Sequence, residues 1–202
     1  MNPAVLKRFI TIAIVAMVAG ALAILAYDWF ESQEPGDYYV RQGDIRLSDG
    51  KYEEALASFD KALVEMPDHR GALMGRALVF IETDRYDEAI EELNHLIAFL
   101  ERTLQPDDQT GFGALAAAHA NLGIVYDRLG RYEDALEEYA TALNTDEESV
   151  SGPGVVDKIL YDADPSTVRD RAIYIYEQLK LPEDERLLSV PEIDAEQRMY
   201  KP

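Results

Sequence analysis

The stretch GRYEDALEEYATAL (Gly130–Leu143) places small and aromatic residues at fixed helical positions, and the chain carries this pattern three times. Each copy reads Tyr-x-x-Ala and has a large residue four positions after the alanine; the three alanines are Ala55, Ala89 and Ala135. The first two alanines are 34 residues apart, and the last two are separated by one such period plus 12 residues. A fixed period of this length predicts a stack of helical hairpins.

Phasing the chain on this pattern gives three repeats at residues 36–69, 70–115 and 116–150, each with two helices. The first repeat is expected to form helices over residues 37–47 and 52–65, because Asp49-Gly50 is a turn signal and Pro67 cannot continue a helix. The second helix of repeat two is expected to run on to about Thr103. The 12 extra residues lie between Glu101 and Ala116, where Pro106 and residues 111–113 predict a loop and the next helix is expected to begin near Ala114.

The third copy has the fullest pattern: His119-x-x-Leu122-Gly123-x-x-Tyr126, then Gly130, Tyr132, Ala135, Tyr139 and Ala142. These residues resemble the tetratricopeptide repeat, a unit of 34 residues with two helices. The resemblance implies an all-α fold, a right-handed solenoid of about three hairpins. Gly43, Ala77 and Gly123 are then small because the first helix of each repeat crosses the second closely.

A hydrophobic segment precedes the repeats. Residues 9–27 contain no charge, which predicts a transmembrane helix between a basic N-terminus (residues 1–8) and a linker (residues 28–35). Lys7 and Arg8 stand before it and acidic residues after it. The positive-inside rule therefore places the N-terminus in the cytoplasm and the repeats across the membrane, in the periplasm if this is a bacterial inner membrane.

Two features of this segment have alternative interpretations. Ala21-Leu22-Ala23 has the form of a signal-peptide cleavage site, so the segment could be removed and the repeats secreted. Small residues at spacings of three and four could instead form a face on which another membrane helix packs; they are Ala13, Ala16, Gly20 and Ala23.

Composition limits the possible functions. Lys7 and Arg8 are the only charged residues before Asp28, so residues 28–202 carry 17 basic and 39 acidic residues and a net charge of −22. Such a domain repels phosphate backbones, which argues against a nucleic-acid partner. The chain has no cysteine, no phosphate-binding loop and no histidines at metal-ligand spacing, so we expect no enzyme, cofactor, metal site or small-molecule substrate.

Residues 151–202 break the repeat rhythm. A short helix is expected over residues 155–161, and Asp164-Pro165 predicts the start of a longer one with its apolar face at Val168, Ala172, Ile175 and Leu179. Ile173 and Tyr176 would widen that face, so this capping helix is expected to be buried on more than one side. An acidic tail with scattered apolar residues follows Pro182, either packed or waiting for a partner.

The resemblance also implies a concave groove lined by the first helices, in which a peptide or helix of a partner protein binds. The residues it places there are Val40, Arg41, Asp44, Met74, Leu78, Ala117, Asn121, Ile124 and Asp127. With so few basic residues, this groove suits an apolar or basic segment better than an acidic one. Alternatively, Met74, Leu78 and Ile124 are core residues, or the chain's own C-terminal segment fills the groove.

The sequence therefore predicts a membrane-anchored scaffold, an accessory subunit or assembly factor of a membrane protein complex. The alternatives are a periplasmic chaperone-like factor that binds unfolded or secreted chains, and a secreted binding module if the N-terminal segment is cleaved.

Overall fold

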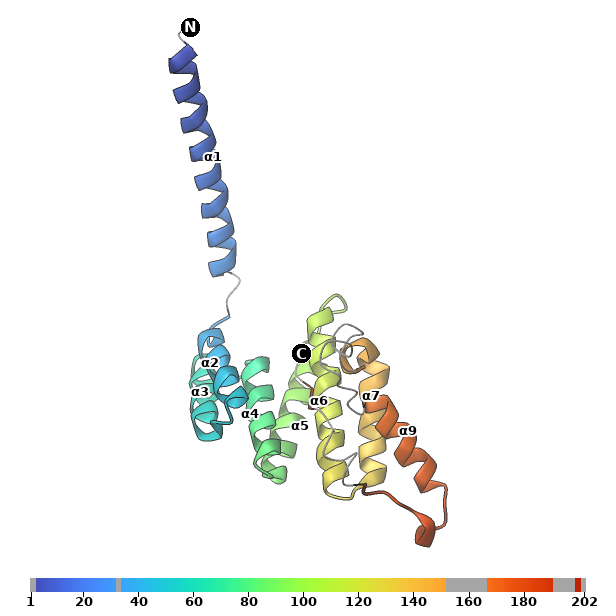
Figure 1. Ribbon diagram of the computed structural model, residues 1–202. Coiled ribbons are helices and arrows are strands. Elements are labelled where there is room, and N and C mark those ends of the chain that lie inside the picture. Colours follow the sequence, from blue (N-terminus) through green and yellow to red (C-terminus); the bar gives the residue numbers. More distant parts are fainter. Residues whose placement is uncertain (1–2, 32–33, 152–166, 191–198, 201–202) are drawn as a thin grey trace.

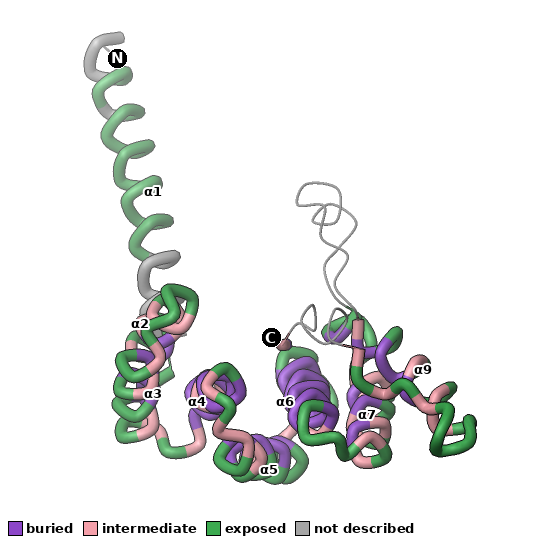
Figure 2. The backbone as a smooth tube through the Cα atoms, turned by 60° about the horizontal axis from the view of Figure 1, so that its bottom comes forward, coloured by how far each residue is buried: buried purple, intermediate pink, exposed green. Residues whose placement is uncertain are grey.

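A computed structural model describes residues 3–31, 34–151, 167–190 and 199–200 of the chain. Within these ranges the chain forms eight α-helices, one short 3-10 helix and no strand. The helices of the repeats are α2 (Asp37–Ser48), α3 (Tyr52–Glu65), α4 (Arg70–Glu82), α5 (Tyr86–Thr103), α6 (Gln109–Arg128) and α7 (Tyr132–Val150). Figure 2 shows that they follow one another along a curve, so the fold is an all-α stack of three hairpins, as the repeat predicts.

Helix α1 (Pro3–Glu31) stands apart from the repeats (Figure 1). It continues four residues beyond the predicted end at Tyr27, because the first helix breakers are Pro35 and Gly36. Its stretch Leu6–Ala23 has a mean hydropathy of 1.9 and none of it is buried. By length and composition this helix can cross a membrane, and a signal sequence has the same properties.

The turns inside the hairpins share one backbone conformation. Gly50 and Gly130 have φ values of 70° and 73°, in the left-handed region that glycine adopts without steric cost. The equivalent turn of the second repeat has Asp84 at φ 57°, the only non-glycine residue with positive φ in the described part of the chain. Aspartate tolerates this region better than most residues, which explains how the second hairpin turns without glycine.

Glycines and aromatic rings set the distance between the helices. A Cβ atom added at Gly43 would lie 2.4 Å from the ring of Phe59, and one at Gly123 would lie 2.6 Å from the ring of Tyr139. The predicted close crossings of the first and third repeats are therefore confirmed. Gly75 on α4, which the repeat pattern did not single out, would also place a Cβ 2.4 Å from Phe59, so this ring packs against two repeats.

The insertion forms a turn at residues 104–108, as Pro106 predicts, and is helical after it. Helix α6 begins at Gln109, so the predicted loop at residues 111–113 and the predicted start near Ala114 are wrong. Asp108 caps the helix, since its side chain accepts a hydrogen bond from the Gly111 N–H at 2.7 Å. The glycines serve packing: a Cβ at Gly111 would lie 2.1 Å from Leu104, and one at Gly113 would lie 2.8 Å from Ser149.

Helix α9 (Val168–Leu179) begins with a capping box between Thr167 and Asp170. The predicted helix over residues 155–161 and the predicted cap at Asp164 lie outside the described residues. Ile173 and Tyr176 are 54% and 52% exposed, so burial on more than one side is wrong. These side chains are exposed because α9 lies at the end of the stack: in the described part of the chain it packs against α7, and no further helix covers its outer side.

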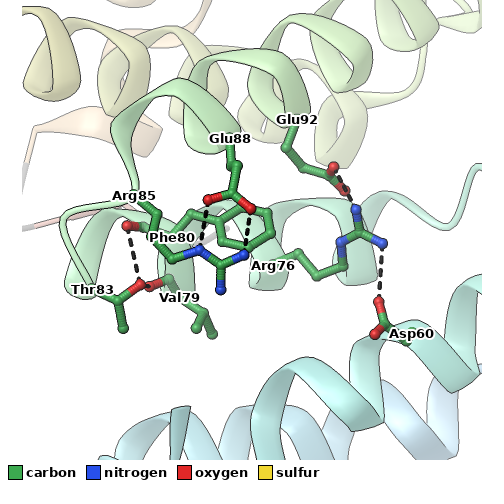
Figure 3. Close-up of polar contacts among 8 residues, drawn as sticks. All are labelled: Asp60, Arg76, Val79, Phe80, Thr83, Arg85, Glu88 and Glu92. Carbon is green, nitrogen blue, oxygen red and sulfur yellow. Dashed lines mark hydrogen bonds and ion pairs between the residues drawn. The ribbon is translucent and has the colours of Figure 1, made fainter. Parts of the chain in front are cut away.

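A network of ion pairs joins the first repeat to the second. Arg76 on α4 donates to Asp60 on α3 at 3.0 Å and to Glu92 on α5 at 2.9 Å (Figure 3). Nearby on the same hairpin, the guanidinium of Arg85 pairs with Glu88 and lies 4.5 Å from the centre of the Phe80 ring (Figure 3). Glu92 is 8% exposed, and its burial raises its pKa above the ordinary value of 4.5.

Replacing Glu92 by glutamine is expected to change how stability depends on pH. A raised pKa means that the folded chain binds more protons than the unfolded chain, so this carboxyl costs increasing stability as pH rises from about 4.5 towards 7. Glu92→Gln should therefore gain stability relative to the unmodified chain over that interval. Chemical denaturation at both pH values measures the difference, with exposed Glu91→Gln as control. A difference that does not change with pH would contradict the assignment.

Candidate functional site

The first helices of the three repeats line a partly open cavity of about 360 Å³. Its walls come from the residues before α2, from α2 and α4, and from the first turns of α6. The lining residues are Glu34, Asp37, Val40, Asp44, His69, Arg70, Gly71, Met74, Thr110 and Ala114. Three of the residues predicted for the partner groove, Val40, Asp44 and Met74, are among them.

One wall of the cavity is apolar. Val40 from α2, Met74 from α4 and Ala114 from α6 contribute side chains that are at most 9% exposed. A ligand held here would bury hydrocarbon against all three repeats. The early start of α6 matters for this wall, because Thr110 and Ala114 lie in its first two turns.

Three carboxylates also line the cavity, Glu34, Asp37 and Asp44. Asp37 accepts a hydrogen bond from the Glu34 N–H at 3.0 Å and lies 3.1 Å from Nε2 of His69. Since a carboxylate can only accept, we assign the proton of this contact to Nε2 of the buried imidazole. These bonds hold Asp37 in place at the start of α2.

The one arginine at the cavity has its charge balanced locally. Arg70 donates to Oδ2 of Asp108 at 3.1 Å. The Gly111 N–H, and to a smaller degree Arg70, hold the pKa of Asp108 below its usual range, so Asp108 stays ionised at neutral pH. Arg70 is paired with Asp108, and carboxylates outnumber basic side chains along the lining, which gives the cavity a negative character that suits a cation.

Farther along α6, Asn121 binds a residue from the chain's own C-terminal segment. Asn121 is fully buried; its Oδ1 accepts from the Tyr200 N–H at 2.8 Å and its Nδ2 donates to the Tyr200 carbonyl at 2.6 Å. The Tyr200 hydroxyl accepts from the Val168 N–H at 3.1 Å. Tyr200, near the C-terminal end of the chain, thus lies against the helix that is expected to bind partners.

A buried ion pair fixes α9 to α6. Both nitrogens Nε and Nη2 of Arg171 donate to the carboxylate of Asp127 at 2.7 Å, and the two side chains are 3% and 4% exposed. The Tyr139 hydroxyl lies 3.2 Å from the same carboxylate. Arg171 also donates to the Leu188 carbonyl at 3.0 Å, which ties down the segment after α9.

The structure places the predicted groove residues in five settings. Val40, Asp44 and Met74 line the cavity, and Asn121 binds Tyr200. Leu78, Ala117 and Ile124 are at most 3% exposed and belong to the main hydrophobic core. Arg41 is exposed and does not line the cavity, and Asp127 is bound to Arg171.

Sequence reasoning missed Glu34, Asp37, His69 and Arg70 as lining residues. One signal was available: Asp37, Val40 and Asp44 follow one another at spacings of three and four, which places them on one helix face. Nothing comparable marked Glu34, which lies outside any helix.

In the described residues no three metal-ligating side chains gather, and no nucleophile has a base beside it at the cavity. The polar groups there can hold a cationic or hydrogen-bonding ligand. The arrangement is that of a binding site.

Curated relatives match part of the chain. It is 29% identical over 109 residues to Protein KINESIN LIGHT CHAIN-RELATED 1 of Arabidopsis thaliana, which is 53% of this chain and 17% of the relative. It is 27% identical over 95 residues to the Hsp70-Hsp90 organizing protein of Triticum aestivum, 47% of this chain and 16% of the relative. The chain thus spans less than a fifth of the length of these relatives.

Solved structures show the same fold at low identity. The first tetratricopeptide domain of Spaghetti (RPAP3), bound to the HSP90 peptide SRMEEVD, matches with a TM-score of 0.52 and 15% identity over 73% of this chain and 94% of that chain. The Sgt2 tetratricopeptide domain of Aspergillus fumigatus matches with a TM-score of 0.50 and 15% identity, over 79% of this chain and 93% of that one.

Two family profiles, both described as tetratricopeptide repeat, match residues 36–107 and 116–149, together just over half of the chain. The gap between the two matches, residues 108–115, falls at the insertion and includes the first turns of α6. The chain therefore belongs to the tetratricopeptide repeat family, whose fold serves protein–protein interaction.

Proposed function

We propose that this protein is a membrane-anchored scaffold that holds a basic, partly apolar segment of a partner protein in the cavity between α2, α4 and α6. The observation that carries the proposal is the charge of the cavity: three carboxylates line it, and its arginine is paired with Asp108. A lysine or arginine side chain could lay its methylene groups on Val40 and Met74 and bring its charge to Asp37 and Asp44.

This preference differs from that of the Spaghetti domain, whose bound peptide SRMEEVD is acidic at its C-terminal end. A shared fold does not imply a shared ligand, because specificity depends on the side chains that line the groove. Here those side chains would repel an acidic peptide.

The test uses the full chain in detergent and two labelled peptides with the same apolar residues. One peptide has lysine and the other glutamate at every remaining position. We expect the lysine peptide to bind about tenfold more tightly or better, and its affinity to fall with added salt. Equal binding of the two peptides would refute the proposal.

A pair of variants separates the cavity from the overall negative charge of the chain. Asp44→Lys reverses a charge in the cavity and Glu91→Lys reverses an exposed charge on α5. Asp44→Lys is expected to weaken the lysine peptide by about tenfold more than Glu91→Lys does, because opposite charges attract most strongly where they are partly desolvated. Equal effects of the two variants would mean that the peptide recognises net charge alone.

The membrane part of the proposal rests on α1, whose length and hydropathy suit a bilayer, and on Lys7 and Arg8 before its apolar stretch. Through this anchor the repeats would serve as an accessory or assembly subunit of a complex in a bacterial inner membrane, on its periplasmic side. A packing face at Ala16 and Gly20 would bring the anchor against a partner helix.

The absence of cysteine allows a direct test of orientation. A single cysteine at exposed Asn144 on α7 should react with a membrane-impermeant maleimide on cells whose outer membrane is permeabilised, whereas one at Asn2 should react only after the inner membrane is disrupted. The reverse pattern would overturn the orientation, and an intact mass lacking the first 23 residues would overturn the anchor.

A further inference from the structure

The contact between Asn121 and Tyr200 has the geometry of peptide recognition within one chain. One carboxamide makes two hydrogen bonds, of 2.8 and 2.6 Å, to the N–H and the carbonyl of the same residue. Such a pair of hydrogen bonds recognises the main chain of a bound segment and does not depend on the side chain of the residue that is bound. Any segment that presents one residue with both main-chain groups exposed could make the same two bonds.

The side chain of Tyr200 is recognised separately. It is 8% exposed and belongs to the main hydrophobic core. Its hydroxyl accepts from the N–H of Val168, the first residue of α9, and the first N–H groups of a helix have no partner within the helix. The seat therefore combines an apolar site for an aromatic ring with a donor for its hydroxyl, which selects tyrosine over phenylalanine.

This seat adjoins the acidic cavity. Met74 lines the cavity, and its Sδ lies 3.3 Å from Nδ2 of Asn121. Ala114, on the cavity wall, and Asn121 lie on the same helix, two turns apart. The concave side thus has an open half beside α2 and α4 and, along α6, a half that Tyr200 occupies.

We propose that the seat around Asn121 is a second peptide subsite, which the chain's own Tyr200 fills and from which a partner segment bearing tyrosine can displace it. This inference rests on the proposed function, since both subsites belong to one groove. While Tyr200 is seated, only a fraction of molecules present an open seat, and the apparent affinity for a competing segment is reduced by that fraction. The C-terminus thereby restricts the groove to partners that provide both a basic residue and a tyrosine.

The test uses the full chain in detergent and a labelled peptide with the sequence of residues 195–202. The unmodified chain should bind it weakly, and Tyr200→Ala, which vacates the seat, should bind it at least about tenfold more tightly. Adding Asn121→Ala to Tyr200→Ala should remove that gain. The same peptide with alanine for tyrosine should not bind, and with phenylalanine it should bind about fivefold more weakly, for want of one hydrogen bond.

Two results would overturn the inference. A folded Tyr200→Ala chain that binds the peptide no better than the unmodified chain would make Tyr200 a core residue only. If Tyr200→Ala loses its helical circular dichroism, Tyr200→Phe is measured in its place. An affinity of Tyr200→Phe for the peptide equal to that of the unmodified chain would then also contradict a displaceable seat. Because the peptide also carries Arg198 and Lys201, Asp44→Lys is expected to weaken its binding to every form of the chain, but the gain from Tyr200→Ala should remain when both substitutions are combined. Failure of the acidic cavity and failure of the Asn121 seat are therefore distinguishable.

Discussion

Replacing Arg171 by methionine is expected to lower the free energy of unfolding by about 3–5 kcal/mol. The substitution leaves the Asp127 carboxylate, 4% exposed, without the guanidinium that makes two hydrogen bonds of 2.7 Å to it. A buried charge that loses its counter-ion keeps its desolvation penalty, which is why removing one partner costs far more than the pair contributes. Chemical denaturation of the full chain in detergent, followed by circular dichroism, measures the loss.

A double substitution provides the control. Asp127→Leu together with Arg171→Met removes both charges, so most of the stability should return even though the Tyr139 hydroxyl loses its acceptor. The single variant should also release the segment at Leu188, whose carbonyl accepts from Arg171. If the single and double variants were equally unstable, packing of the Arg171 side chain rather than its charge would be responsible.

Replacing Phe59 by alanine is expected to cost about 3–5 kcal/mol, the usual range for deleting a buried aromatic ring. The Phe59 ring is fully buried, and it fills the space left by Gly43 on one side and Gly75 on the other. Neither glycine has a side chain that could move into the vacated volume, so the cavity should stay open. Because Gly75 belongs to the second repeat, the loss should loosen the stack between repeats as well as the first hairpin.

Phe99→Ala is the matched control, since Phe99 on α5 is only partly buried. The two variants delete the same atoms, so the difference in their unfolding free energies reports the closeness of packing at Phe59. Equal losses of unfolding free energy in the two variants would contradict the idea that Gly43 and Gly75 make the packing around Phe59 unusually close. A smaller volume change, Phe59→Leu, should lie between the two.

The sequence alone determined the architecture of this protein. Stacked repeats are specified by short-range requirements that recur with the period of the structure, so Ala55, Ala89 and Ala135 phase the chain, and all three are fully buried. The same reasoning predicted helix ends as far as Thr103 in α5. It failed at residues 111–113, where glycines that pack against Leu104 and Ser149 resemble the glycines of a loop.

The candidate site was predictable only in part, for a physical reason. Val40, Asp44 and Met74 could be placed because each repeat presents equivalent positions to the concave side. The charge of the cavity depends on which groups meet there: Arg70 is neutralised by Asp108, 38 residues away, and Asp37 contacts His69 across 32 residues. The sequence lists these groups but does not bring them together.

Tyr200 shows the same difference between what the sequence predicts and what the tertiary structure decides. From the sequence, the tail either packs on the repeats, fills the groove or waits for a partner. Tertiary structure alone seats Tyr200 on Asn121, 79 residues earlier, because that contact requires the curve of the three hairpins and the position of α9 at their end. Local periodicity thus determines that this chain stacks, while long-range geometry decides which part of its groove is open and which part the chain occupies itself.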